Sequence, residues 1–277
     1  MSLLPPHPVH QTTDRGEQAA AMDEIRARRD AGRAGQGRVL AVVTSHDQLG
    51  DTGYPTGYWI SELAHPYLAL TRAGYDVDVA SPQGGAAPLD AWSDPRSDAA
   101  QNPGDFVSTG FLLNDLTRLK VEHTQRLADI DPAEYLGLFF VGGYGGAYDL
   151  ADDPDVARLT RAVWEAGGVV GAICHGAPAL LNVTLSDGAP LIDGRRLTGF
   201  SKAEDEEVEK TVGTPFLDGV YTEDLLRAKG AHYERGALFQ PFAVTADDGR
   251  LVTGQQQFSG EVFGDALVQA LDRVRAA

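Results

Sequence analysis

Cysteine is almost absent from this sequence: one stands among 277 residues. A single cysteine cannot form a disulfide within the chain, so a reducing compartment is favoured and we expect a cytoplasmic protein. Long apolar runs are also missing, which argues against a membrane-spanning helix. The first residues lack the positive region and the continuous apolar core of a signal peptide. The sequence therefore predicts neither export nor membrane insertion.

Basic side chains are scarce relative to acidic ones. There are 23 Lys and Arg against 40 Asp and Glu, a formal net charge of −17. A strongly negative protein repels phosphate groups, so we expect neither nucleic acid nor an anionic membrane as a partner. The simplest interpretation of this excess of acidic residues is that it keeps the protein soluble.

The chain divides into an extension and one domain. Residues 1–36 contain few large apolar side chains, which predicts a partly helical or flexible N-terminal extension. From residue 37 to 277, apolar segments of strand length alternate with segments of helical spacing. This order predicts an α/β domain with a mostly parallel central sheet and helices on both faces, a flavodoxin-like sandwich. We expect helices at residues 59–72, 111–130 and 154–166, and a strand at 169–173.

The lone cysteine lies at a predicted junction between a strand and a helix. Cys174 directly follows the apolar strand 169–173, and Gly176 leaves room for a sharp turn. Unpaired N–H groups at the start of the next helix favour a thiolate over a thiol. A lone intracellular cysteine is commonly a core residue. The junction together with the adjacent His175 instead favours a reactive nucleophile.

A cysteine nucleophile needs a base, a group that orients the base, and N–H donors for an oxyanion. His175 is the expected base. Gly143 follows a predicted strand and can offer one oxyanion N–H, while the backbone N–H of His175 offers another. The orienting carboxylate is expected within the acidic run 201–207, which otherwise would be a solvated helix start.

Three further side chains are candidates with two interpretations each. Glu62 lies on the apolar helix 59–72, where burial would raise the pKa of its carboxyl and let it donate or carry a proton. Its spacing allows an exposed position equally well. Trp59 and Tyr144 are candidates for the wall of a substrate pocket, and the pattern fits core positions as well.

Other patterns are weaker. His232 and Glu234 form a His-x-Glu pair of the kind that glutamine amidotransferases use, but they lie in a short connecting strand. The glycine spacing at 142–146 does not match a dinucleotide-binding loop. No metal-ligand spacing relates the dispersed histidines His46, His65 and His123. We expect no cofactor and no metal.

Three segments resemble a known family. They are residues 56–67 (TGYWISELAHPY), 171–176 (GAICHG) and 197–200 (LTGF). In this order they resemble the ThiJ/PfpI superfamily, which has the class I glutamine amidotransferase-like fold. More narrowly, they are similar to the branch that contains glyoxalase III enzymes and heat-shock holdases. The resemblance spans residues 38–277.

The resemblance implies a set of site residues. Cys174 would be the nucleophile, His175 the triad histidine, Gly143 an oxyanion donor and Glu62 the carboxyl beside the sulfur. The third triad member would be Asp205.

The sequence departs from the family pattern at three places. Relatives usually have Glu at the position of Asp205, so the adjacent Glu204 stays open as the orienting group. Relatives commonly have His at the position of Tyr144. Residues 253–258 (TGQQQF) replace a segment that often reads TGQNP.

The resemblance also implies an activity. A cofactor-independent lyase of the glyoxalase III type would convert methylglyoxal-like 2-oxoaldehydes to 2-hydroxy acids without metal, glutathione or nucleotide. The alternatives are a stress-response holdase or redox sensor, and another cysteine hydrolase or hydratase of the superfamily. A homodimer is expected by the same resemblance.

Overall fold

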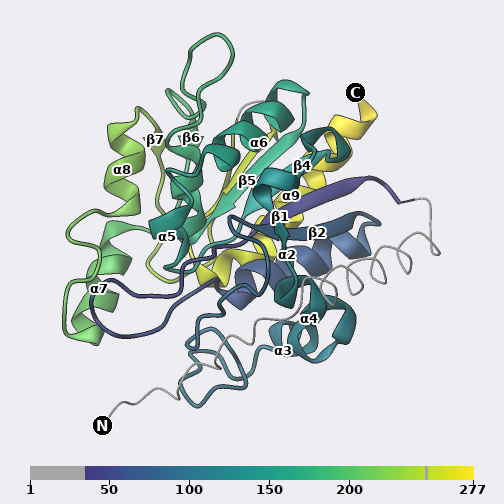
Figure 1. Cartoon of the computed structure of the whole chain (residues 1–277). Coiled ribbons are helices and arrows are strands. Elements are labelled where there is room, and N and C mark those ends of the chain that lie inside the picture. Colours follow the sequence, from purple (N-terminus) through teal and green to yellow (C-terminus); the bar gives the residue numbers. More distant parts are fainter. Residues whose placement is uncertain (1–34, 247–248) are drawn as a thin grey trace.

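A seven-stranded sheet forms the centre of the computed structural model (Figure 1), which describes residues 35–246 and 249–277. Most of the predicted N-terminal extension, residues 1–34, lies outside the described residues. The strand order is β3-β2-β1-β4-β5-β9-β8, and all neighbours pair in parallel except β8 with β9. These strands are β1 Arg38–Val42, β2 Asp76–Ser81, β3 Gln125–Arg126, β4 Gly137–Phe140, β5 Val169–Ile173, β8 Ala243–Ala246 and β9 Leu251–Gly254.

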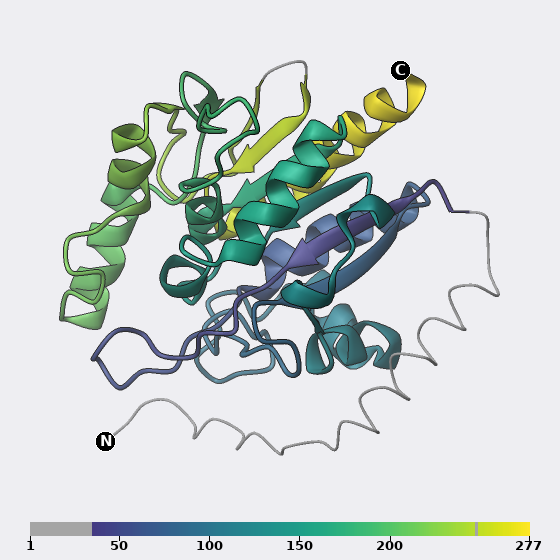
Figure 2. The same cartoon turned by 45° about the horizontal axis from the view of Figure 1, so that its top comes forward.

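Alternating side chains of the strands build two hydrophobic cores. In β1, Val39 and Ala41 pack on the face covered by helices α2 and α9, while Leu40 and Val42 pack on the face covered by α6. Figures 1 and 2 show α6 on one face and α2 with α9 on the other. The predicted parallel sheet with helices on both faces is confirmed.

The helices follow the sequence signals for their ends. Asp153 accepts hydrogen bonds from the first free N–H groups of α6, and proline begins the helix. The α-helices are α2 Ile60–Arg72, α3 Phe106–Leu113, α4 Asp115–Glu122, α5 Gly146–Asp149, α6 Pro154–Glu165, α7 Lys202–Val212, α8 Thr222–Ala228 and α9 Gly260–Ala276. Shorter 3-10 helices are η1 Leu127–Asp129, η2 Pro132–Glu134, η3 Cys174–Leu180 and η5 Gln257–Ser259. Within the two described ranges, no helix combines the length and the apolarity needed to cross a bilayer.

The single helix predicted over residues 111–130 is wrong. Asn114 separates α3 from α4, and its side chain accepts a hydrogen bond from the N–H of Leu116. An Asn side chain competes for backbone N–H groups and so begins a new helix here. The remainder of the predicted segment forms β3 and η1.

A small second sheet lies beside the main sheet, with helices α7 and α8 near it (Figure 1). Strand β6 (Arg196–Leu197) pairs in parallel with β7 (His232–Tyr233). Glu234 pairs with Arg196 across these strands, and His232 is exposed. The His-x-Glu pair therefore belongs to the small second sheet, where Glu234 forms an ion pair with Arg196.

The strand order reverses at β1, because the chain places β2 on one side of it and β4 on the other. In open α/β sheets, ligands bind beyond the carboxyl ends of the strands near such a point. The loop after β4 and the turn after β5 both lie there.

Candidate active site

Cys174 occupies a strained turn directly after β5. Its φ is +58°, whereas Ile173 before it is extended. A non-glycine residue in the left-handed region is uncommon and is often found at functional sites. The strand and the turn lie where the sequence places them, but the helix that follows is the 3-10 helix η3. A short 3-10 helix supplies less of the dipole that was expected to favour a thiolate.

Gly176 makes this turn possible. A β-carbon there would lie 2.4 Å from the carbonyl oxygen of Phe140 at the end of β4. Only glycine lets the two backbone segments approach so closely. The turn that carries Cys174 is therefore held against the loop that follows β4.

His175 connects the sulfur to a carboxylate. Its Nδ1 lies 3.5 Å from Cys174 Sγ, and its Nε2 lies 3.0 Å from Asp205 Oδ1. All three side chains are buried. The structure thus brings together a thiol, an imidazole and a carboxylate in the order of a catalytic triad.

Glu204 points elsewhere. Its carboxylate accepts hydrogen bonds from Ser201 Oγ at 2.7 Å and from Gln255 Nε2 at 3.0 Å. Together with the Ser201 side chain it forms a capping box at the start of α7. Of the two candidates for orienting His175, Asp205 is the one in hydrogen-bond contact with it.

Gly143 lies close to the sulfur in the loop after β4. Its φ is +97°, and a β-carbon there would lie 2.3 Å from the carbonyl oxygen of Gly57. The backbone N–H groups of Gly143 and His175 stabilise the ionised sulfur and so oppose the rise in the pKa of Cys174 described below. Two such donors at one atom are the elements of an oxyanion hole.

Glu62 approaches Cys174 from α2. A β-carbon on Gly142 would lie 2.4 Å from Glu62 Oε2 and 2.6 Å from Cys174 Cβ, so both side chains converge on this glycine. Glu62 is 0% exposed. Although its carboxyl faces the Cys174 thiol and the Gly142 N–H, neither oxygen has a hydrogen bond of regular geometry with any described residue.

Burial controls the protonation of this pair. It raises the pKa of the Cys174 thiol well above its ordinary value, and the negative charge of Glu62 raises that pKa further. Burial also raises the pKa of Glu62 to about 8. Two adjacent buried acids cannot both ionise easily, so the pair holds a proton near neutral pH. The thiolate expected from the sequence therefore forms only while Glu62 keeps its proton.

Tyr144 and Trp59 occupy different surroundings. Tyr144 is buried, with its hydroxyl 3.3 Å from Asp205 Oδ1 and its ring 4.3 Å from that of His175. Trp59 lines a cleft of about 110 Å³ together with His65 and Asp105. Tyr144 thus contacts His175 and Asp205, whereas the cleft that Trp59 lines is bordered by neither of them nor by Cys174.

Phe200 is a site residue that the sequence reasoning did not assign. Its ring stacks on His175 at 4.5 Å and 30°. The sequence signal for Phe200 was its position in the LTGF segment, five residues before Asp205. Nothing in the sequence shows that the Phe200 ring contacts the ring of His175. Among residues 35–246 and 249–277, no group of three or more His, Cys, Asp or Glu side chains is arranged to hold a metal ion.

The sequence profile of the DJ-1/PfpI family matches residues 56–270. Glyoxalase 3 of Candida albicans is 28% identical over 240 residues, covering 85% of this chain and 98% of that protein. A protein/nucleic acid deglycase, HchA of Staphylococcus aureus, is 25% identical over 227 residues and matches 79% of this chain and 73% of its own length. Among solved structures, Rapid Encystment Protein 24 kDa of Francisella tularensis superposes with a TM-score of 0.75 at 33% identity, covering 85% of this chain and 99% of that one.

Proposed function

Because the chain belongs to the DJ-1/PfpI family, we propose that it is a cofactor-independent glyoxalase that converts small 2-oxoaldehydes such as methylglyoxal to 2-hydroxy acids. The observation that carries the proposal is the position of Cys174 between the Glu62 carboxyl and the His175 imidazole. A nucleophile with a proton carrier on either side suits a reaction that moves protons between adjacent carbons. The similarity to Glyoxalase 3 of Candida albicans supports the same reaction.

The first step is addition to the aldehyde. The Cys174 thiol gives its proton to His175, and the sulfur forms a bond to the aldehyde carbon. The aldehyde oxygen becomes an oxyanion, which accepts hydrogen bonds from the backbone N–H groups of Gly143 and His175. The imidazolium of His175 then returns its proton to this oxygen. Asp205 stabilises the imidazolium that forms on His175. The product of this step is a hemithioacetal.

The second step is an internal oxidation and reduction. A base, Glu62 or His175, removes the proton from the former aldehyde carbon, and an enediol forms. A proton returns to the neighbouring carbon, so the ketone is reduced to an alcohol while the aldehyde carbon becomes a thioester. Water then cleaves the thioester, releasing the 2-hydroxy acid and the thiol. The net reaction adds one water to the 2-oxoaldehyde, with no external oxidant or reductant.

The direct test follows lactate formation from methylglyoxal by purified protein without added glutathione. Since Cys174 is the one cysteine of the chain, iodoacetamide alkylates a single defined thiol. We expect lactate to form, alkylation to abolish its formation, and methylglyoxal to slow alkylation. Turnover that persists after complete alkylation would refute the proposal.

An untreated protein that forms no lactate would favour the other interpretations. Suppression of client aggregation by that protein would then indicate a holdase. The expectations of a homodimer and of no nucleic-acid partner stay predictions, and a hydrodynamic measurement decides the first.

Two adjacent acids on α7 provide a test of the triad assignment. We expect Asp205→Asn to lower kcat by about 100-fold or more, because an amide cannot stabilise the imidazolium of His175. Glu204→Gln should lower the melting temperature, because the amide NH2 group would face donors that now bind the carboxylate, among them the N–H of Phe239 and Nε2 of Gln255, while kcat stays within about threefold. The opposite pattern, with the larger kcat loss in Glu204→Gln, would contradict the assignment of Asp205.

A further inference from the structure

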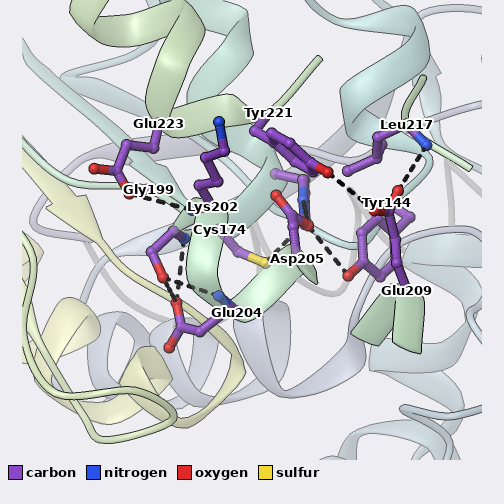
Figure 3. A network of polar contacts seen from close by, with 12 residues as sticks. Tyr144, Cys174, Gly199, Lys202, Glu204, Asp205, Glu209, Leu217, Tyr221 and Glu223 are labelled. Atoms are coloured by element: carbon purple, nitrogen blue, oxygen red, sulfur yellow. Dashed lines mark hydrogen bonds and ion pairs between the residues drawn. The ribbon is translucent and has the colours of Figure 1, made fainter. Parts of the chain in front are cut away.

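We propose that Tyr144 is a positioning residue, which holds the carboxylate of Asp205 with its hydroxyl and the imidazole of His175 with its ring. The inference rests on the proposed function, since it concerns the same triad. Figure 3 shows Tyr144 directed at Asp205. The hydroxyl of Tyr144 donates to Asp205 Oδ1 at 3.3 Å, and the same oxygen accepts His175 Nε2 at 3.0 Å.

Asp205 has few other groups to hold it. It is 0% exposed, and its second oxygen, Oδ2, has no hydrogen-bond partner among the described residues. Removal of either donor to Oδ1 would therefore leave the carboxylate with one hydrogen bond. A buried carboxylate held by one bond is less firmly oriented and less easily ionised.

The charge state of both groups supports this role. Burial raises the pKa of Asp205, while His175 and the hydroxyl of Tyr144 oppose that rise. Burial also raises the pKa of Tyr144 well above its ordinary value, so its hydroxyl keeps the proton and remains a donor. Tyr144 thus favours the ionised carboxylate that an imidazolium needs beside it.

The ring of Tyr144 is fixed independently of its hydroxyl. It meets the ring of Phe216 edge-on, with centroids 4.8 Å apart and planes at 88°. Phe216 is fixed in turn, because its N–H donates to Glu209 Oε1 at 3.0 Å. Glu209 also accepts a hydrogen bond from the hydroxyl of Tyr221 at 3.0 Å, and Figure 3 shows Glu209 near Tyr144. The ring that contacts His175 therefore also packs against a ring that is itself held in place.

Tyr144→Phe tests the proposal, because it removes the hydroxyl and keeps the ring. Tyr135→Phe is a matched control: its hydroxyl also donates to a buried carboxylate, Asp78 Oδ2, at 3.3 Å, but at the opposite end of the sheet. We expect Tyr144→Phe to lower kcat about tenfold with KM within twofold. The acid limb of its pH profile should move to higher pH, because the pKa of Asp205 rises when a donor is lost. Tyr135→Phe should change neither.

Alkylation of Cys174 separates this proposal from the proposed function. The rate of reaction with iodoacetamide against pH reports thiolate formation whether or not methylglyoxal is turned over. We expect its midpoint to move to higher pH in Tyr144→Phe and to stay unchanged in Tyr135→Phe. A shift without lactate formation by the unmodified protein would support the role of Tyr144 and reject the glyoxalase reaction. Identical pH profiles in Tyr144→Phe and the unmodified protein would overturn the role of Tyr144.

Discussion

Replacement of Cys174 by alanine should reduce methylglyoxal turnover by at least about 10⁴-fold, to the background rate. The thiolate forms the only covalent bond between protein and substrate in the proposed reaction. Without the sulfur, no hemithioacetal forms, so the proton carriers beside it have no bound intermediate to act on. Lactate measured over hours with the purified variant checks the result.

Cys174→Gly separates loss of chemistry from loss of folding. Glycine adopts the φ of +58° found at this position without strain, whereas alanine keeps the strain of the cysteine. We expect both variants to be inactive, and the glycine variant to be the more stable of the two by about 1 kcal/mol in urea unfolding. Measurable turnover by a folded variant would exclude Cys174 as the nucleophile.

The sequence predicted those features of this site that depend on residues close together in the chain. It did not predict the features that depend on how separate helices and strands pack against each other. Short-range pattern was sufficient to predict the strand 169–173, the turn at Cys174 and the adjacent His175, because they lie within seven residues of each other. The acid that orients His175 could not be predicted from short-range pattern. Asp205 and Glu204 are neighbours on α7, and successive helical side chains point about 100° apart. Which of them faces His175 is decided by the rotation of α7 against η3, which no local pattern encodes.

The same argument applies to Glu62. Its helix was predicted, but the spacing allowed an exposed or a buried carboxyl. The structure buries it because Trp59, at the start of α2, donates its N–H to the carbonyl oxygen of Gly142, and this contact turns Glu62 toward the sulfur. The contact joins residues far apart in the chain, so only the assembled sheet reveals it.

Glu62→Gln should lower activity and raise stability at the same time. Loss of a proton carrier should reduce kcat by about 100-fold or more. Alkylation of Cys174 should nevertheless become faster, because the negative carboxylate that raises the pKa of the thiol is gone. Turnover and thiol reactivity therefore change in opposite directions, which a merely damaged site would not produce. The measurements are lactate formation and the iodoacetamide rate at pH 8 and above, where the Glu62 carboxyl of the unmodified protein is ionised.

The stability effect of Glu62→Gln depends on pH with a definite sign. The carboxyl loses its proton near pH 4.5 in the unfolded chain but only near pH 8 in the folded protein. Between these values the folded state binds more protons, so the free energy of unfolding falls as pH rises. The variant has no such proton, so its curve should lack this decline and lie above that of the unmodified protein near pH 8.

Asp90→Asn is the matched control for this prediction. Burial raises the pKa of Asp90 to about 6, but its carboxylate accepts hydrogen bonds from Thr56 Oγ1 at 2.7 Å and from the Trp92 N–H at 2.9 Å. Replacing a buried carboxylate that has regular partners disturbs them, so Asp90→Asn should lower the melting temperature at pH 8. Glu62 lacks such partners among the described residues, so its amide variant should gain stability there. A drop in stability for both variants at pH 8 would contradict the stability effect expected from the raised pKa of Glu62.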